Sequence, residues 1–263
     1  MRAVPTLMAT LLVVAVTAAS ARQINPAPIE AAANAPARPA ADRARDAARH
    51  PVQTLGFFGV QPGMKVVEIS PGGGYWTPML ARIVGPTGHL YLAMDGNPAQ
   101  IAKLKAKLAA DPVYANTSIT TFGEGKYDIA PPASVDRVLT FRNIHNWMAA
   151  GFAPDAFHSF YRALKPGGVL GLEEHRLPEA RTTDLDGSKG YVKTSAVVAM
   201  AKAAGLVVEH KSEINANSKD KADYPKGVWT LPPTYAEGDK DRARYAAIGE
   251  SDRMTIAFVK PGI

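Results

Sequence analysis

A glycine-rich segment between an apolar run and a helix start carries the strongest chemical signal in the sequence. Residues 66–77 read VVEISPGGGYWT, which predicts a strand, a tight turn and the first turn of a helix. Glycines let a ligand come close to the backbone, and the unpaired N–H groups of a helix start can bind it. We therefore expect a nucleotide-like cofactor at this turn.

The spacing within this segment separates three classes of nucleotide site. A dinucleotide site uses G-x-G-x-x-G, but Thr77 stands where the third glycine would be, and a P-loop needs a Gly-Lys-Ser/Thr ending that is absent. The third pattern, an acid at the strand end followed by turn residues at every second position, resembles the S-adenosylmethionine (SAM) motif of class I methyltransferases. It assigns four cofactor-binding residues here: Glu68, Ser70, Gly72 and Gly74. Ser70 departs from the motif, which usually has glycine at that position.

Two acids after the next strands are candidates for the nucleoside part of the cofactor. Asp95 ends the second expected strand, where a carboxylate can accept hydrogen bonds from both ribose hydroxyls. Because Asp95 and Gly96 form a common turn pair, a plain turn aspartate is the alternative. The upstream glycines favour ribose binding. Glu124 follows the third strand and is a candidate for the adenine side, with a solvated loop acid as the alternative.

The segment FRNIHNW, residues 141–147, follows the fourth expected strand and predicts the reacting centre. Ligands of open α/β sheets lie at the carboxyl ends of the strands, so these residues face the expected methyl group. His145 is our candidate catalytic residue, since its ordinary pKa suits a general base. Asn143 is a candidate for binding the methionine part of SAM, and Trp147 for an apolar wall. The alternative is a capped loop with a structural histidine and a buried tryptophan.

The fifth expected strand ends in Glu173, Glu174 and His175, which with His145 have the chemistry of metal ligands. Adjacent residues of a strand face opposite sides of a sheet, whereas a metal needs its ligands on one side. We therefore expect no metal here and favour a substrate-pocket role for Glu174 or His175.

Alternating strands and helices must position these residues. Strands are expected at 65–69, 89–94, 118–122, 135–141, 168–173, 206–213 and 254–259, and helices at 75–84, 98–110, 154–164 and 191–204. Such alternation favours a mostly parallel sheet with helices on both faces.

Five segments give a more specific resemblance: EISPGGGYWT, FRNIHNW, LKPGGVLGLEEH, GVWTLPPT and ESDRMTIAFVKP. Together they resemble a group of exported bacterial proteins described as class I SAM-dependent methyltransferases, over about residues 60–260. The resemblance implies an α/β, Rossmann-like methyltransferase sheet with an antiparallel last strand. It also implies SAM as cofactor and a small-molecule acceptor that the sequence does not identify.

The N-terminal part of the chain predicts export and a helical cover. Arg2, the apolar run over 7–16 and the small residues 19–21 predict a signal peptide over 1–21, and hence a periplasmic or secreted protein without a membrane span after cleavage. Residues 22–41 are rich in Ala and Pro and predict a linker. Residues 42–263 are expected to form one methyltransferase-like domain, with an N-terminal helical cover. A long connection at about 215–252 either shapes the acceptor pocket or shields a sheet edge.

Composition excludes several function classes. The 263 residues include no cysteine, which excludes disulfides, iron–sulfur clusters and thiol catalysis. The formal net charge is +6, but basic and acidic residues are interleaved, as in 42–49, so we expect no nucleic-acid partner. Oligomeric state is not predicted. Because SAM is made in the cytoplasm, the alternative function is an exported, non-catalytic ligand-binding protein on a methyltransferase fold.

Overall fold

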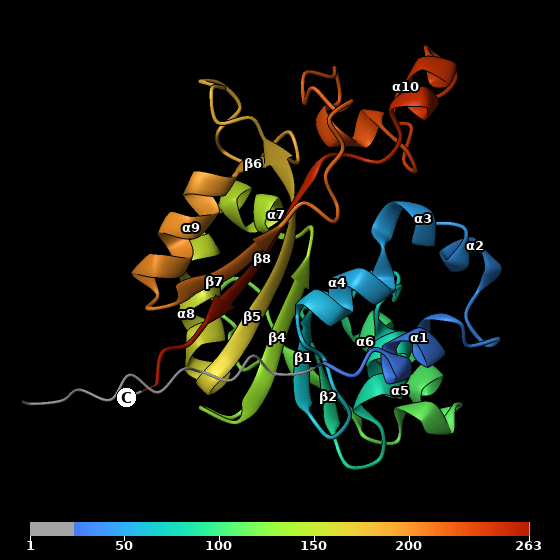
Figure 1. Ribbon diagram of the computed structural model, residues 1–263, viewed down its shortest axis with the longest axis vertical. Helices are drawn as coiled ribbons and strands as arrows, with labels where there is room; N and C mark the ends of the chain where they lie inside the picture. Colours follow the sequence, from blue (N-terminus) through green and yellow to red (C-terminus); the bar gives the residue numbers. More distant parts are fainter. Residues whose placement is uncertain (1–23, 263) are drawn as a thin grey trace, which may run out of the picture.

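The expected strands form one twisted sheet whose order places β1 and β4 at its centre. The computed structural model describes residues 24–262, in which the strands run β3-β2-β1-β4-β5-β8-β7, with β6 beside the end of β5 (Figure 1). β8 is antiparallel to both of its neighbours, β5 and β7, whereas the pairs among β1 to β5 are parallel. The predicted fold class, with its antiparallel last strand, is confirmed. The bounds are β1 (Lys65–Ile69), β2 (His89–Met94), β3 (Thr117–Thr121), β4 (Val135–Phe141), β5 (Leu164–Leu177), β6 (Val192–Lys193), β7 (Val207–Ser212) and β8 (Arg253–Val259).

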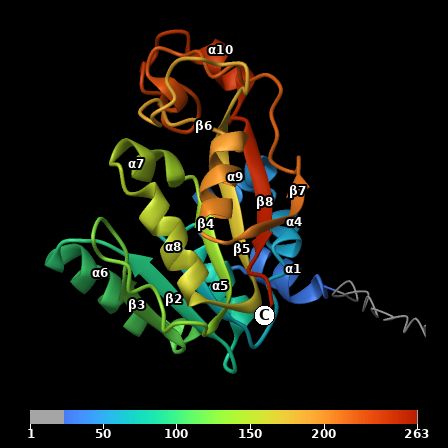
Figure 2. The ribbon, with the colours of Figure 1, turned by 90° about the vertical axis from the view of Figure 1, so that its left-hand side faces the viewer.

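Helices cover both faces of the sheet because alternate strand residues point to opposite sides. The core cluster that contains Val66 includes residues of α1, α4, α5 and α6. The cluster that contains its neighbour Val67 includes residues of α7, α8 and α9. Figure 2 shows α7, α8 and α9 in front of the sheet and α1 and α4 behind it. The bounds are α1 (Ala27–Ala33), α2 (Ala40–Arg43), α3 (Asp46–Arg49), α4 (Pro51–Phe57), α5 (Thr77–Val84), α6 (Pro98–Ala109), α7 (Ile144–Ala149), α8 (Ala153–Ala163), α9 (Thr194–Ala203) and α10 (Arg242–Ile248).

The expectation of a linker over residues 22–41 is wrong for the part that forms α1. Ile29, Ala32 and Ala33 are buried in the core shared with α4 and α5. These three residues are spaced i, i+3 and i+4, so one side of a short helix can bury them even though the segment is rich in Ala and Pro. The predicted signal peptide lies outside the described residues. Within residues 24–262, no helix has the length and apolar character that a membrane span requires.

The long connection forms a layer beyond the carboxyl end of β5 (Figure 1). It contains the short 3-10 helix η2 (Gly227–Thr230) and α10, and it has a small core of its own around Tyr224, Leu231 and Tyr245. The connection is therefore a packed cover at the end of the sheet where ligands bind in α/β folds.

Candidate functional site

The glycine turn after β1 adopts the left-handed conformations that its sequence predicts. Gly72 and Gly74 have φ angles of +57° and +81°, and Ser70 has a φ of +49°. Such angles favour glycine, which explains the family's preference at the position of Ser70. Ser70 nevertheless makes the same turn, and its backbone N–H donates to the carbonyl of Ala93 at the end of β2 (2.8 Å).

Glu68 holds this turn against the start of α5. Its buried carboxylate accepts a hydrogen bond from the Thr77 hydroxyl (2.7 Å). Desolvation by burial raises the pKa of Glu68 from 4.5 to about 7, although the Thr77 hydrogen bond and the charge of Lys107 act in the other direction. Thr77, which excluded a dinucleotide motif in the sequence, therefore has a structural role of its own.

Two adjoining cavities open on either side of the turn. The Asp95 cavity, of about 690 Å³, is lined by residues after β1 and β2 and on α6. The His145 cavity, of about 410 Å³, reaches the end of β4 and the long connection. They share a wall made of Asn143 and residues 70–73. A Cβ built at Gly73 would meet nothing within 4 Å, so bare backbone faces this space and a cofactor fits against it.

The predicted cofactor residues divide between the two cavities, with one exception. Glu68 lines the His145 cavity, Gly74 and Asp95 line the Asp95 cavity, and the remaining three belong to the shared wall: Ser70, Gly72 and Asn143. Glu124 lines neither cavity. It is exposed in a tight turn closed by the paired backbones of Gly123 and Lys126, which directs the loop toward solvent.

The side chain of Asp95 is half-exposed and accepts hydrogen bonds from two donors. Its Oδ1 accepts from the backbone N–H of Gly96 and from the ammonium of Lys126, both at 3.1 Å. Residues 95–97 form neither helix, strand nor turn, so the structure shows no turn at the Asp95-Gly96 pair that the sequence offered as an alternative.

Asn143 ties the ends of two central strands together. Its side-chain amide donates to the carbonyl of Ile69 at the end of β1 (3.2 Å) and lies 3.4 Å from the Thr140 hydroxyl. This bond fixes Asn143 in the wall between the cavities, directly before the helix that carries His145.

His145 and Glu174 form a buried pair in the His145 cavity. The Nδ1 atom of His145 lies 3.0 Å from Oε1 of Glu174, and the backbone N–H groups of Ile144 and His145 donate to Oε2 (2.5 and 3.2 Å). Since an ionised carboxylate only accepts hydrogen bonds, His145 donates from Nδ1, which leaves Nε2 as a proton acceptor. Residues 144–149 form the helix α7, which the sequence analysis did not predict.

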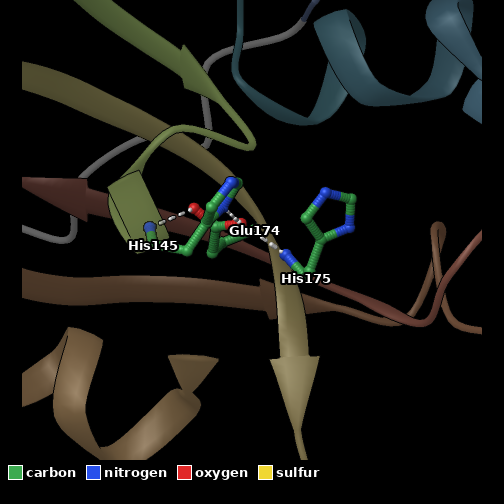
Figure 3. A group of neighbouring side chains, drawn as sticks. All are labelled: His145, Glu174 and His175. Atoms are coloured by element: carbon green, nitrogen blue, oxygen red, sulfur yellow. Dashed lines mark hydrogen bonds and ion pairs between the residues drawn. The ribbon is translucent and has the colours of Figure 1, made fainter. Parts of the chain in front are cut away.

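His175 lies on the other side of the Glu174 carboxylate, as Figure 3 shows. Its Nδ1 atom is 2.5 Å from the Ser251 hydroxyl, and its ring centre is 5.4 Å from that of His145. Desolvation, followed by the proximity of His145 and Arg142, holds the pKa of His175 well below its usual value. His175 is therefore a neutral wall of the cavity at physiological pH.

The geometry of this cluster permits a metal ion, which the sequence analysis did not expect. His145, Glu174 and His175 each offer a ligand atom, and these atoms lie within 4.8 Å of one another, closer than strand alternation suggested. Burial, followed by nearby positive charges, lowers the pKa of His175, so its ring is neutral and can bind a proton or a metal ion. The cluster therefore has the chemistry of proton handling, and its geometry also admits a metal ion.

Aromatic and proline residues of the long connection line the His145 cavity, which the sequence analysis anticipated only in part. Trp229 and Pro232–Pro233, from the long connection, line the His145 cavity, as one of its two interpretations expected. Trp147 does not: it is buried in the core against Phe122, so the expectation of a pocket wall is wrong for this residue.

Sequence reasoning missed three arginines that line the same cavity: Arg45, Arg49 and Arg142. Arg142 directly follows β4 and has a left-handed φ of +61°, a conformation that costs energy for a residue other than glycine. Its position within the predicted FRNIHNW segment was the available signal. Arg45 and Arg49 belong to the helical cover, and their sequence gave no indication of the cavity.

Comparisons with known proteins agree with this geometry. A family model described as a methyltransferase domain matches residues 66–168, which include the glycine turn, Asp95 and His145. A ubiquinone/menaquinone biosynthesis C-methyltransferase from Shewanella pealeana is 33% identical over 133 residues, covering 48% of each chain. One from Pseudomonas aeruginosa is 28% identical over 192 residues, covering 73% of this chain and 71% of that protein. The chain thus spans about half the length of the first of these relatives.

A solved structure shows the same fold at low sequence identity. A SAM-dependent methyltransferase from Aquifex aeolicus superposes with a TM-score of 0.57 and 17% identity, covering 90% of this chain and all of that one. The sheet order, the glycine turn, the family model and the relatives agree: residues 66–168 match the methyltransferase-domain family, and the chain has the fold of a class I methyltransferase.

Proposed function

We propose that this protein transfers the methyl group of SAM to a small-molecule acceptor held in the His145 cavity. One observation carries the proposal: the Asp95 cavity and the His145 cavity meet at a single wall of glycine backbone and Asn143. A cofactor seated across this wall would extend from Asp95 toward His145. SAM, when bound, supplies an activated methyl group, so the protein needs only to align the acceptor and remove its proton.

We assign the cofactor contacts to the residues that line this wall and the Asp95 cavity. Asp95 would accept hydrogen bonds from the ribose hydroxyls, and Gly72 and Gly74 would let the cofactor approach the backbone. Glu68 acts through Thr77, by holding the turn in shape. Ser70, which departs from the motif, has the left-handed φ that glycine usually supplies there, so this departure does not argue against a cofactor at the turn.

We assign proton removal to His145 and its positioning to Glu174. The Nδ1–H bond to Glu174 fixes the ring and leaves Nε2 free to take a proton from the acceptor. The carboxylate would also stabilise the imidazolium that forms, and Trp229, with its ring centre 5.9 Å from that of His145, limits access of water. Alignment of two bound reactants contributes about 7–11 kcal/mol, and a general base about 10²–10⁴-fold.

We further propose that the protein is exported, on the basis of Arg2, the apolar run over 7–16 and the small residues 19–21. Intact-mass analysis of the protein from its native host should then find a chain beginning near Arg22. A full-length product in the cytoplasm would contradict export and would remove the question of how SAM reaches the protein.

Calorimetry with SAM, S-adenosylhomocysteine and NAD tests the cofactor assignment directly. We expect SAM and S-adenosylhomocysteine to bind at one site and NAD not to bind. A purified, folded protein with no affinity for SAM would overturn the proposed function, and binding of SAM without methyl transfer to any acceptor in host extracts would favour the non-catalytic alternative.

A further inference from the structure

We propose that the acceptor carries an anionic group, a carboxylate or a phosphate, which Arg49 and Arg142 bind in the His145 cavity. This inference rests on the proposed function, because it concerns the substrate class of the same site. The walls of this cavity hold more arginines than carboxylates that pair with them.

A cluster of buried or half-buried ionic groups lies at this cavity, and four of its six members line the cavity: Arg45, Arg49, Arg142 and Glu250. Four arginines belong to the cluster, Arg45, Arg49, Arg142 and Arg253, and the two glutamates paired with them are Glu173 and Glu250. Within residues 24–262, these ion pairs therefore leave two positive charges of the cluster without a matching carboxylate. Burying uncompensated charge is unfavourable, so an imbalance of this kind favours the binding of a counterion.

Two of the arginines already use the two glutamates at short range. Arg45 binds Oε1 of Glu250 with two nitrogens (2.8 and 2.9 Å). Arg253 lies 3.2 Å from Oε2 of Glu250 and 3.3 Å from Glu173, and it donates to the carbonyl of Ala48. These two arginines hold the cover onto the sheet.

Arg49 and Arg142 are the two arginines of this cluster whose side chains donate no hydrogen bond to another described residue. Arg49 is 3% exposed, its Nε is 3.7 Å from Glu250, and no side-chain hydrogen bond from it is found among the described residues. Arg142 is 4.0 Å from Glu173, and its buried Nε likewise has no hydrogen-bond partner in that part of the chain. A guanidinium carries five N–H donors in a fork that matches a carboxylate or phosphate.

The two guanidinium groups also act on each other. Burial is the largest cause that lowers the pKa of Arg49 to about 9, and the charge of Arg142 is the next. Arg49 lies over the face of the Tyr75 ring, at 4.4 Å from its centre, which leaves the edge of the guanidinium free. Because both arginines line the cavity, an anion bound there would meet two positive charges and free donors.

The other charged groups near the cavity cancel this excess only in part. The Glu174 carboxylate does not line the cavity, and its oxygens already accept from His145 Nδ1 and from the backbone N–H groups of residues 144, 145 and 175. Asp42 is half-exposed and forms no ion pair with these arginines in the described chain, so at most one of the two charges is screened. Glu68, with its pKa raised to about 7, is substantially protonated near neutral pH. His175 is neutral. His145, Arg49 and Arg142 line the same cavity, which therefore favours an anion beside His145.

Anion binding to the cofactor-loaded protein tests this inference. The protein is saturated with S-adenosylhomocysteine, and inorganic phosphate, then acetate, is titrated at constant ionic strength. Trp76 and Trp229 line the cavity, so their fluorescence reports binding. We expect Arg49→Gln and Arg142→Gln each to weaken phosphate binding by about 10-fold or more, while calorimetry shows unchanged affinity for S-adenosylhomocysteine. The matched control Arg162→Gln, on α8 and outside both cavities, should change neither.

The outcomes separate this inference from the proposed function. If S-adenosylhomocysteine binds but neither anion binds the loaded protein, the inference is wrong and the proposed function stands. If phosphate binds only the free protein, and S-adenosylhomocysteine displaces it while 5′-methylthioadenosine does not, the arginines serve the carboxylate of the cofactor and the acceptor claim is overturned. If no SAM-type ligand binds, the proposed function itself fails.

Discussion

The Asp95 cavity and the His145 cavity lie side by side, but the chain builds them in different ways. The Asp95 cavity is lined by residues 70–114 and Asn143, all inside the segment that matches the methyltransferase family model. The His145 cavity adds residues from the N-terminal cover, 42–49, and from the C-terminal part of the chain, 228–234 and 250–251. Those additions lie outside the matched segment.

This difference explains why relatives identify the cofactor class and not the acceptor. The turns and strand ends that line the Asp95 cavity all belong to the segment that the family model matches. The His145 cavity is closed in addition by elements that lie before and after this segment in the sequence. The acceptors of the quinone C-methyltransferases therefore do not transfer to this chain, since function depends on the site and not on the fold.

The largest expected effect separates the two cavities by function. His145→Ala should lower methyl transfer by about two orders of magnitude or more, because the general base is lost, while SAM affinity stays largely intact. The measurement uses labelled SAM with an acceptor found by screening host extracts. His145→Gln keeps a hydrogen-bonding group but cannot take a proton at neutral pH, so it should be equally slow. Unchanged turnover in both variants would exclude His145 from the mechanism.

Glu68 gives the next largest effect, on stability as a function of pH. Its pKa is about 7 in the folded protein and 4.5 ordinarily, so between these values the unfolded chain loses a proton that the folded chain keeps. The free energy of unfolding of the parent should therefore fall as pH rises from about 4.5 to 7, by about 3 kcal/mol at most from this group. Glu68→Gln should remove that fall.

Urea denaturation of parent and variant at several pH values between 4.5 and 8 measures the difference. The control is Glu124→Gln, which changes an exposed acid outside both cavities and should leave the pH profile of the parent unchanged. A parallel profile for parent and Glu68→Gln would show that the buried carboxyl does not titrate in this range.

Asp95→Ala should act on the cofactor side alone. Loss of the ribose acceptor should weaken SAM binding by roughly 10- to 150-fold, which corresponds to about 1.5–3 kcal/mol for hydrogen bonds to a charged group. Calorimetry gives the affinity, and Glu124→Ala is again the matched control. An Asp95→Ala protein that folds normally and binds SAM like the parent would contradict the ribose assignment.

The residues that line the Asp95 cavity could be predicted from the sequence better than those that line the His145 cavity, for a physical reason. The Glu68-to-Gly74 turn and Asp95 follow from local backbone rules, since a strand end, a left-handed turn and a helix start need particular residues at fixed spacing. Glu124 was expected beside the adenine and lines neither cavity. The position of a loop after a strand depends on the loop's own turn, which is closed here between Gly123 and Lys126.

Contacts between distant parts of the chain were beyond local reasoning. Arg49 and Glu250 are 201 positions apart and meet only because the cover and the last connection fold over the same strand ends. Ile29 is buried by packing against α5, although its Ala- and Pro-rich surroundings indicated a linker. The role of Glu174 likewise required knowing that α7 begins beside the end of β5.

The smallest expected effect concerns Lys126, which pairs with Asp95 at 3.1 Å. Both side chains are about half exposed, 54% and 51%, so the ion pair contributes less than about 1 kcal/mol to stability. Lys126→Ala should thus leave unfolding nearly unchanged. It should raise SAM affinity by up to about fivefold, because the ribose hydroxyls no longer compete with an ammonium for the carboxylate.

Lys103→Ala, which removes a positive charge from α6 in the same cavity, controls for general electrostatics. Equal shifts in the two variants would trace the effect to charge alone, and a loss of affinity in Lys126→Ala would mean that Lys126 holds Asp95 in its binding position.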